Sequence, residues 1–76
     1  INRLFQDSIL RIDHVLNQVV LHTLPGSAQS VAFAIDHAKW HEVIGTIAGD
    51  DTILLICNSV ESVELVLDRI QDLMRD

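Results

Sequence analysis

Two pairs of short apolar runs, each pair joined by a turn-forming stretch, constrain the fold of this sequence more than any other feature. The runs are rich in β-branched and aliphatic residues, as strands are, and they cover residues 8–15, 18–24, 43–48 and 52–57. The connecting stretches are Leu16–Asn17 and Gly49–Asp50–Asp51, whose residue types favour turns. We also expect Gly49 to supply the positive φ that hairpin turns often need. The sequence therefore predicts two β-hairpins.

A helical pattern separates the two hairpins. Pro25–Gly26 ends the second run, and Gly26 or Ser27 is expected to begin a helix that continues to Ala38. At about 100° per residue, one stripe of this helix is apolar and consists of Ala28, Val31, Ile35 and Ala38. A second face combines Gln29, Phe33 and Asp36. The helix therefore has one face for its own core and another that carries polar groups beside an aromatic ring.

A second helical pattern follows the last apolar run. Asn58 is expected to cap this helix, with Glu61 three residues later in the spacing of a capping box. Leu65 falls outside the apolar stripe and is a candidate subunit contact. The stripe consists of Val60, Val63, Val66, Leu67, Ile70, Leu73 and Met74. The predicted fold class is α+β: a two-layer ββαββα arrangement in which two helices cover one face of a four-stranded, mostly antiparallel sheet.

The size of the chain favours self-association. Its 76 residues suffice for one domain, and because they begin at Ile1 rather than Met we expect a piece of a longer protein. A domain this small buries only about 60% of the surface of its unfolded chain. The single Cys57 is expected to be a buried, reduced thiol that forms no internal disulfide. Apolar residues on the helix-free face of the sheet also need a partner, so we expect an oligomer.

Charge and missing motifs exclude several function classes. A net charge of −6 makes this segment a poor binder of nucleic-acid phosphates by itself. No apolar run approaches the ~20 residues that span a bilayer, and no signal peptide is visible, so we expect a cytoplasmic protein without membrane contact. The sequence has no Ser/His/Asp or Cys/His motif and no Gly-rich phosphate loop. We therefore predict that it is not an enzyme and has no cofactor.

The adjacent acids Asp50 and Asp51 have two interpretations. They can be solvated turn residues. Neighbouring carboxylates repel each other, however, unless a cation or several hydrogen-bond donors compensate their charges. Gln29 and Asp36 add polar groups on the helix face described above. A site rich in carboxylates suits a cationic ligand, and a guanidinium pairs with a carboxylate in bidentate fashion. His22, close to Pro25–Gly26, can reach the same ligand.

A metal ion is the competing cation. Asp36, Asp50 and Asp51 are oxygen ligands of the kind that Mg²⁺ prefers. His37 and His41 have the i, i+4 spacing of a helical metal site. Trp40 lies between these histidines, however, and the helix is expected to end near Lys39. We therefore predict no metal site.

Two stretches of the sequence resemble the C-terminal domain of the bacterial arginine repressor family. They are HTLPGSAQ, residues 22–29, and GTIAGDDT, residues 45–52, and the similarity extends over essentially the whole chain. The resemblance implies that residues 1–76 form an arginine-binding and oligomerisation domain of a regulator of arginine metabolism. It further implies trimers that stack into hexamers with L-arginine between them. An N-terminal winged helix-turn-helix domain, absent from this chain, is expected to bind operator DNA.

The resemblance also assigns candidate site residues. Gln29 matches a ligand-contacting glutamine and Asp36 an acid seven residues later. At least one member of the acidic pair is implied to meet arginine from a facing subunit. The candidate arginine-binding residues are Gln29, Asp36, Thr46, Ala48, Asp50 and Asp51, with His22 and Ala28 as further candidates. Two alternatives stay open: an assembly domain that does not respond to ligand, and a small carboxylate-based metal-binding or enzymatic module.

Overall fold

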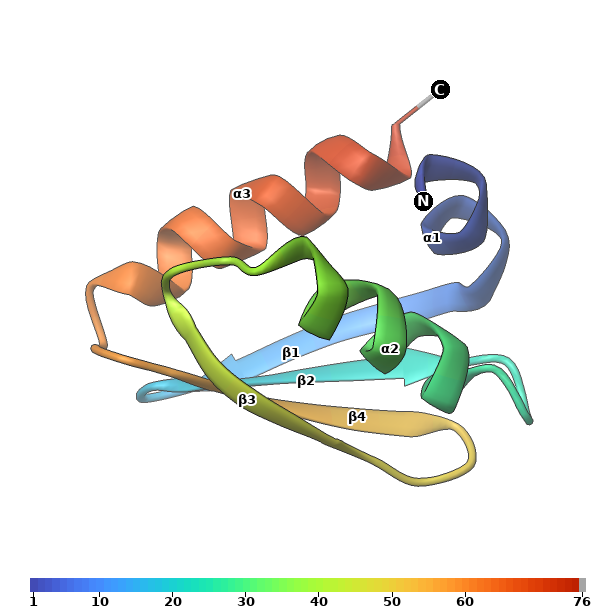
Figure 1. Ribbon diagram of the computed structural model, residues 1–76, viewed down its shortest axis with the longest axis horizontal. Coiled ribbons are helices and arrows are strands. Elements are labelled where there is room, and N and C mark those ends of the chain that lie inside the picture. The colour runs from blue at the N-terminus through green and yellow to red at the C-terminus, as the bar shows by residue number, and fades with distance from the viewer. Residues whose placement is uncertain (76) are drawn as a thin grey trace.

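Three helices lie on one face of a four-stranded sheet in the computed structural model of the chain, which describes residues 1–75 (Figure 1). In chain order the elements are α1 (Asn2–Ser8), β1 (Ile9–Val15), β2 (Gln18–Thr23), α2 (Ala28–Ala38), β3 (Val43–Ala48), β4 (Thr52–Cys57) and α3 (Ser62–Met74). The predicted α+β, two-layer fold with four strands is confirmed. The structure adds one helix, α1, to the two that were predicted.

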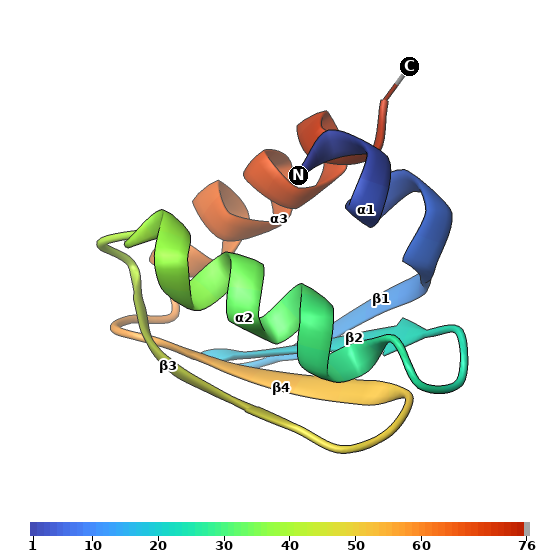
Figure 2. The same cartoon turned by 45° about the vertical axis from the view of Figure 1, so that its right-hand side comes forward.

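The sheet joins the two predicted hairpins side by side. Its strand order is β1-β2-β4-β3, and every neighbouring pair is antiparallel. The central pair is β2 with β4, in which Val19 faces Leu55 and Leu21 faces Ile53. Strands β1 and β3 therefore form the two edges of the sheet. Of these two edge strands, β3 is the one that packs against α2 (Figure 2).

Positive backbone φ angles occur at turns other than the one predicted. Gly49 was expected to adopt one, and this is wrong. Among residues 1–75, Gly26 is the glycine with a positive φ, at 83°. The Gly49 amide instead donates to the Thr52 carbonyl at 2.9 Å, which closes the β3–β4 turn. In the β1–β2 turn, Leu16 has a φ of 53° although a β-carbon disfavours that region.

The core lies between the sheet and the helices. Alternate residues of β2 and β4 point toward the helices, as the period of two along a strand requires. The buried apolar side chains are Phe5, Ile9, Val19, Leu21, Ala28, Val31, Ala32, Ile35, Ile53, Leu55, Cys57, Val63, Val66, Leu67 and Ile70. In α2, Ala38 was predicted to be in the apolar stripe but is exposed. Ala32 is buried instead, because the core-facing side of this helix is centred on Val31 and Ile35.

Helix α1 closes one end of the core. Phe5 is fully buried in this seven-residue helix, and its ring meets the Trp40 ring edge-on at a centroid distance of 6.5 Å. The Gln6 side-chain amide donates to the Arg75 carbonyl, which ties α1 to the end of α3. These contacts are long-range, and a helix this short depends on such contacts more than on its own propensity. The local sequence therefore did not indicate it.

Helix α3 begins later than predicted. Asn58 does not cap it; Glu61 is the residue before the helix, and Val60 is exposed outside it. The Ser62 amide donates to Ser59 Oγ at 3.1 Å, and Ser62 Oγ donates to the Ser59 carbonyl at 2.9 Å. This pair of bonds forms a turn ahead of the helix, so the Asn58–Glu61 capping box does not form. The rest of the predicted stripe, from Val63 to Met74, is buried or half-buried.

The helix-free face of the sheet remains apolar. Ile47 is 71% exposed on this face, and Val20, Leu54 and Ile56 beside it are half-buried. Leu65, on the outer side of α3, is 54% exposed, as expected from its position off the stripe. Two separate surfaces of this small domain therefore keep aliphatic side chains in contact with water.

Candidate functional site

A groove runs along the seam between α2 and β3. Its volume is about 490 Å³, within the range of roughly 300–1,000 Å³ that is usual for small-molecule sites. The groove is lined by Gln29, Ser30, Ala32, Phe33, Asp36, Thr46 and Ala48. Four of the predicted site residues, Gln29, Asp36, Thr46 and Ala48, therefore come together here from two consecutive elements of the chain.

Two hydrogen bonds between α2 and β3 orient the polar groups of the groove. The Gln29 amide Nε2 donates to the Ala48 carbonyl at 2.8 Å and lies 3.5 Å from the Gly49 carbonyl. Thr46 Oγ1 donates to Asp36 Oδ1 at 2.9 Å. Both bonds are solvent-exposed. Gln29 and Asp36 lie seven residues apart on the helix, nearly two turns, so they point in the same direction.

The acidic pair lies at the end of β3, outside the residues that line the groove. Asp50 Oδ2 accepts from the Gly26 amide at 3.2 Å, and Asp51 Oδ1 accepts from Thr52 Oγ1 at 3.0 Å. Both aspartates are exposed. Among residues 1–75, no cation forms a salt bridge with Asp36, Asp50 or Asp51. Asp36 in the groove wall and Asp50 and Asp51 beyond the end of β3 thus have only neutral hydrogen-bond donors.

The main chain of the acidic turn is fixed to two other elements. The Asp50 carbonyl accepts from the amides of Gly26 at 3.1 Å and Ala28 at 3.2 Å. The Asp51 carbonyl accepts from the Thr23 amide at 2.8 Å. The turn is therefore bound to the end of β2 and to the start of α2.

The two remaining candidates lie elsewhere. His22 is on the helix-free face, where its Nε2 is 3.2 Å from Asp13 Oδ2 and 3.0 Å from Arg11 Nη2. The side chain of Ala28 is fully buried in the core, so this residue offers the site only its backbone. The structure does not bring either side chain into the groove.

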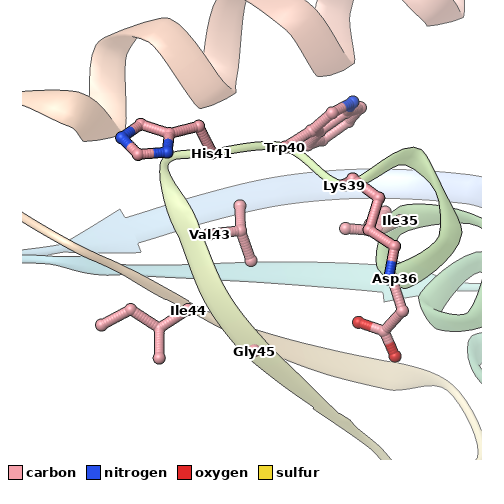
Figure 3. Close-up of a pocket in the computed structure, with 8 residues that line it drawn as sticks. All are labelled: Ile35, Asp36, Lys39, Trp40, His41, Val43, Ile44 and Gly45. Atoms are coloured by element: carbon pink, nitrogen blue, oxygen red, sulfur yellow. The ribbon is translucent and has the colours of Figure 1, made fainter.

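A second hollow of about 360 Å³ continues the seam beyond Asp36 (Figure 3). It is lined by Ile35, Asp36, Lys39, Trp40, His41, Val43, Ile44 and Gly45. In Figure 3 the Asp36 carboxylate is directed toward β3, whereas the Trp40 ring is turned toward the helix above it. Asp36 lines both hollows and so marks the boundary between them.

An internal ion pair lies beside Trp40, which lines the second hollow. Arg69 Nη1 lies 2.8 Å from Glu42 Oε1, and the Arg69 guanidinium is 5.2 Å from the centroid of the Trp40 ring. The hydrogen bond from Arg69 lowers the pKa of the Glu42 carboxyl below its ordinary value. Burial, and secondarily the Glu42 charge, raises the pKa of the Cys57 thiol. Cys57 is therefore a buried neutral thiol, as predicted.

The described residues do not support a metal site. Within residues 1–75, no group of three or more His, Cys, Asp or Glu side chains is arranged to hold a metal ion. Helix α2 ends at Ala38 and Lys39 turns into the left-handed region, so His37 and His41 do not share a helical face. No helix in the same part of the chain is both long and apolar enough to cross a membrane.

Sequence reasoning missed three residues of the groove. Phe33 was noted on the helix face of Gln29 and Asp36 but was not among the candidate site residues, although it lines the groove. Ser30 and Ala32 line it, although neither was among the candidates. Ser30 carries no signal in the sequence, because its role as part of the groove wall depends on how α2 is rotated over β3.

The chain matches a known family over most of its length. The family model described as "Arginine repressor, C-terminal domain" matches residues 5–72. The arginine repressor of Heliobacterium modesticaldum is 49% identical over 71 residues, which are 93% of this chain and 47% of that protein. The arginine repressor of Symbiobacterium thermophilum is 49% identical over 73 residues, 96% of this chain and 49% of that protein.

A third relative gives the same result. The arginine repressor of Staphylococcus aureus is 46% identical over 74 residues, covering 97% of this chain and 49% of that protein. The chain thus spans about half the length of the curated relatives it matches. Each of these relatives is named as a repressor, in agreement with the prediction of a non-enzymatic domain.

Proposed function

This chain belongs to the family of arginine repressor C-terminal domains, and we propose that it binds L-arginine in the α2–β3 groove and assembles with copies of itself. The observation that carries the proposal is Asp36. Its carboxylate is oriented by Thr46, lines the same groove as Gln29, and has no salt-bridge partner among residues 1–75. An oriented carboxylate without a cation suits a ligand that brings its own positive charge.

The acidic pair completes the site from a neighbouring copy. Asp50 and Asp51 are exposed and lie at the end of the seam rather than in its wall. Their charges therefore project toward whatever covers this end of the domain. A facing subunit that presents its own acidic turn to the groove would surround the ligand with carboxylates from two chains. Arginine binding would then favour assembly, because the site is complete only in the oligomer.

Assembly of the copies uses the apolar surfaces described above. The helix-free face, with Ile47, Val20, Leu54 and Ile56, supports a homotrimer, and the acidic ends of two trimers pair into a hexamer. In the longer parent protein, which acts in the cytoplasm, a winged helix-turn-helix domain outside this chain would contact operator DNA. Gathering several such domains on one core raises their avidity for paired operator sites. Genes of arginine metabolism would be controlled in this way.

Calorimetric titration with L-arginine tests the ligand. We expect binding to the 76-residue chain and a loss of roughly tenfold or more in affinity for Asp36→Asn. Hydrogen bonds to charged groups contribute about 1.5–3 kcal/mol, and about 1.4 kcal/mol is tenfold. The matched control is Asp68→Asn, which removes an exposed carboxylate of α3. Equal affinity for both variants, or no heat of binding to the wild-type chain, contradicts the proposal.

A mixing experiment tests whether the acidic turn acts on a second copy. One variant carries Asp36→Asn and the other carries Asp50→Asn with Asp51→Asn. Each is expected to bind arginine poorly alone. When the two are co-expressed, some interfaces pair an intact Asp36 with an intact acidic turn of the other chain, so a fraction of the sites recovers. If binding stays as weak in the mixture as in either variant, the turn acts within its own subunit.

Sedimentation analysis tests the assembly itself. We expect a mass of at least three chains, and a higher proportion of six when arginine is added. Ile47→Lys places a charge on the helix-free face and is expected to dissociate the trimer, whereas Glu64→Lys, at an exposed charged position of α3, serves as the control. A monomeric wild-type chain with and without arginine would refute the assembly.

A further inference from the structure

One residue of the groove is out of character with its polar neighbours. Phe33 lines the groove together with Gln29 and Asp36, yet 63% of its surface is exposed. Large aromatic side chains contribute most when they are buried. The position contributes nothing to the core, which is formed by the opposite face of α2. An exposed phenylalanine at the rim of a hollow requires a different explanation from a core phenylalanine such as Phe5.

The Phe33 ring is held in place from one side. The His37 imidazole stacks on it at a centroid distance of 4.0 Å and an interplanar angle of 32°. His37 Nδ1 in turn lies 3.2 Å from the Phe33 carbonyl, the i, i+4 bond that anchors the imidazole to its own helix. The described residues provide no second aromatic partner for Phe33. One face of the ring is backed by His37, and the rest of the ring remains available to the groove.

The surroundings of the ring match a planar cation. Along α2, Phe33 lies between Gln29, one turn before it, and Asp36, about one turn after it, so the ring stands beside the groove's amide and carboxylate. A guanidinium has polar edges and weakly hydrated faces. The edges can be satisfied by Asp36 and Gln29, and a face is attracted to the negative π surface of an aromatic ring. The groove offers both kinds of contact within the two turns of α2 from Gln29 to Asp36.

Resting on the proposed function, we propose that Phe33 determines the specificity of this groove by stacking on the guanidinium of the bound ligand, with His37 as the positioning residue behind the ring. Asp36 recognises charge, which lysine and arginine share. Phe33 adds recognition of a flat, delocalised cation. The two residues together distinguish arginine from its neutral, flat analogue citrulline and from its compact ammonium analogue lysine.

The test compares ligand selectivity across substitutions of Phe33. Affinities for L-arginine, L-citrulline and L-lysine are measured by calorimetry, with competition for the weak ligands. A cation over an exposed aromatic ring contributes about 0.5–1 kcal/mol. We therefore expect Phe33→Leu to lower the arginine-to-citrulline affinity ratio about two- to fivefold. Phe33→Trp should keep or raise that ratio, because tryptophan is the strongest of the aromatic partners.

Two further variants complete the design. His37→Ala keeps the ring but removes what backs it, so the ratio should fall by less than in Phe33→Leu. Glu64→Ala removes an exposed side chain of α3 that does not line the groove and should leave the ratio unchanged. Thermal melts without ligand show whether each variant is folded, and an exposed side chain such as Phe33 should tolerate leucine.

The outcomes distinguish a failure of the Phe33 stacking role from a failure of arginine binding in the groove. If the wild-type chain does not bind arginine, the proposed function fails and this specificity fails with it. If the wild-type chain binds arginine but Phe33→Leu keeps the same arginine-to-citrulline ratio, only the role of Phe33 is refuted. A Phe33→Leu variant that loses ligand-free assembly while its ratio is unchanged would identify the ring as a contact between copies instead.

Discussion

Two junctions between helix and sheet in this domain treat their carboxylates in opposite ways. At the α3 junction, Glu42 is paired with Arg69 at 2.8 Å, and the guanidinium also lies over Trp40. At the α2–β3 seam, Asp36 accepts a hydrogen bond from the Thr46 hydroxyl and forms no salt bridge with residues 1–75. The paired junction is complete within one chain, whereas the proposed function places a cationic ligand at the unpaired one.

The largest expected effect breaks the paired junction at its core. Phe5→Ala removes a fully buried ring that contacts Trp40 edge-on. Substitutions of this kind cost about 3–5 kcal/mol through lost burial and a residual cavity. Denaturant unfolding measures the loss. Phe33→Ala is the comparison, because that ring is exposed and its removal should cost well under half as much. A similar loss of unfolding free energy in both variants would contradict the distinction between a core Phe5 and an exposed Phe33.

A smaller effect is expected when the orientation of Asp36 is disturbed. Thr46→Val removes the hydroxyl that donates to Asp36 Oδ1 and keeps the shape of the side chain. A net hydrogen bond is worth about 0.5–1.5 kcal/mol, so arginine affinity should fall roughly two- to tenfold in calorimetry. Thr52→Val removes a hydroxyl that donates to Asp51 within its own turn. Comparing the two variants measures how much Asp36 and Asp51 each contribute to arginine affinity. Undiminished affinity in Thr46→Val would remove Thr46 from the site.

The connection between the two junctions offers a stabilising change. Lys39 follows α2 with φ 57° and ψ 44°, a left-handed conformation in which glycine is strongly preferred. Lys39→Gly should therefore raise the free energy of unfolding by roughly 1 kcal/mol. Lys39→Ala is the matched control, since it removes the same side chain but keeps the β-carbon. If both variants are stabilised equally, the gain comes from the charge and not from the backbone.

The smallest effect concerns the pH dependence of the paired junction. Because Arg69 lowers the pKa of Glu42 below its ordinary value of 4.5, this pair stabilises the fold above that pH. The contribution is lost as the pH falls through the lowered pKa of the folded state. Glu42→Gln should therefore flatten the decline of stability in acid, measured as melting temperature against pH. Glu64→Gln on α3 is the control, and an equally flat profile for it would contradict the role of the pair.

The sequence predicted the two hairpins and α2 because their patterns are local. A period of two, turn residues and a helical stripe all act over a few neighbouring positions. Helix α1 was missed because Phe5 gains its burial from Trp40 and α3, which are distant in the sequence. The start of α3 was misplaced because Ser59 and Ser62 form a turn that competes with the capping box at Asn58.

The candidate site was predictable only in part, for a similar reason. Gln29 and Asp36 share a helix face, so their spacing alone brings them together. Their meeting with Thr46 and Ala48 depends on β3 being the edge strand beneath α2, which follows from the sheet order. His22 was a reasonable candidate by its nearness to Pro25–Gly26. The strand alternation directs it to the other face, where Asp13 and Arg11 occupy it.

The backbone bonds of the acidic turn have a kinetic consequence. The carbonyls of Asp50 and Asp51 accept hydrogen bonds from amides at the end of β2 and the start of α2. The tip of the β3–β4 hairpin is therefore anchored to the rest of the domain. A molecule that reaches it loses little free energy to ordering the chain. The rate of its association would be governed by diffusion and by long-range electrostatic attraction to the acidic turn. The association rate should then fall as ionic strength rises. The observed rate should also keep increasing with ligand concentration, whereas it would reach a plateau if a conformational change had to precede binding.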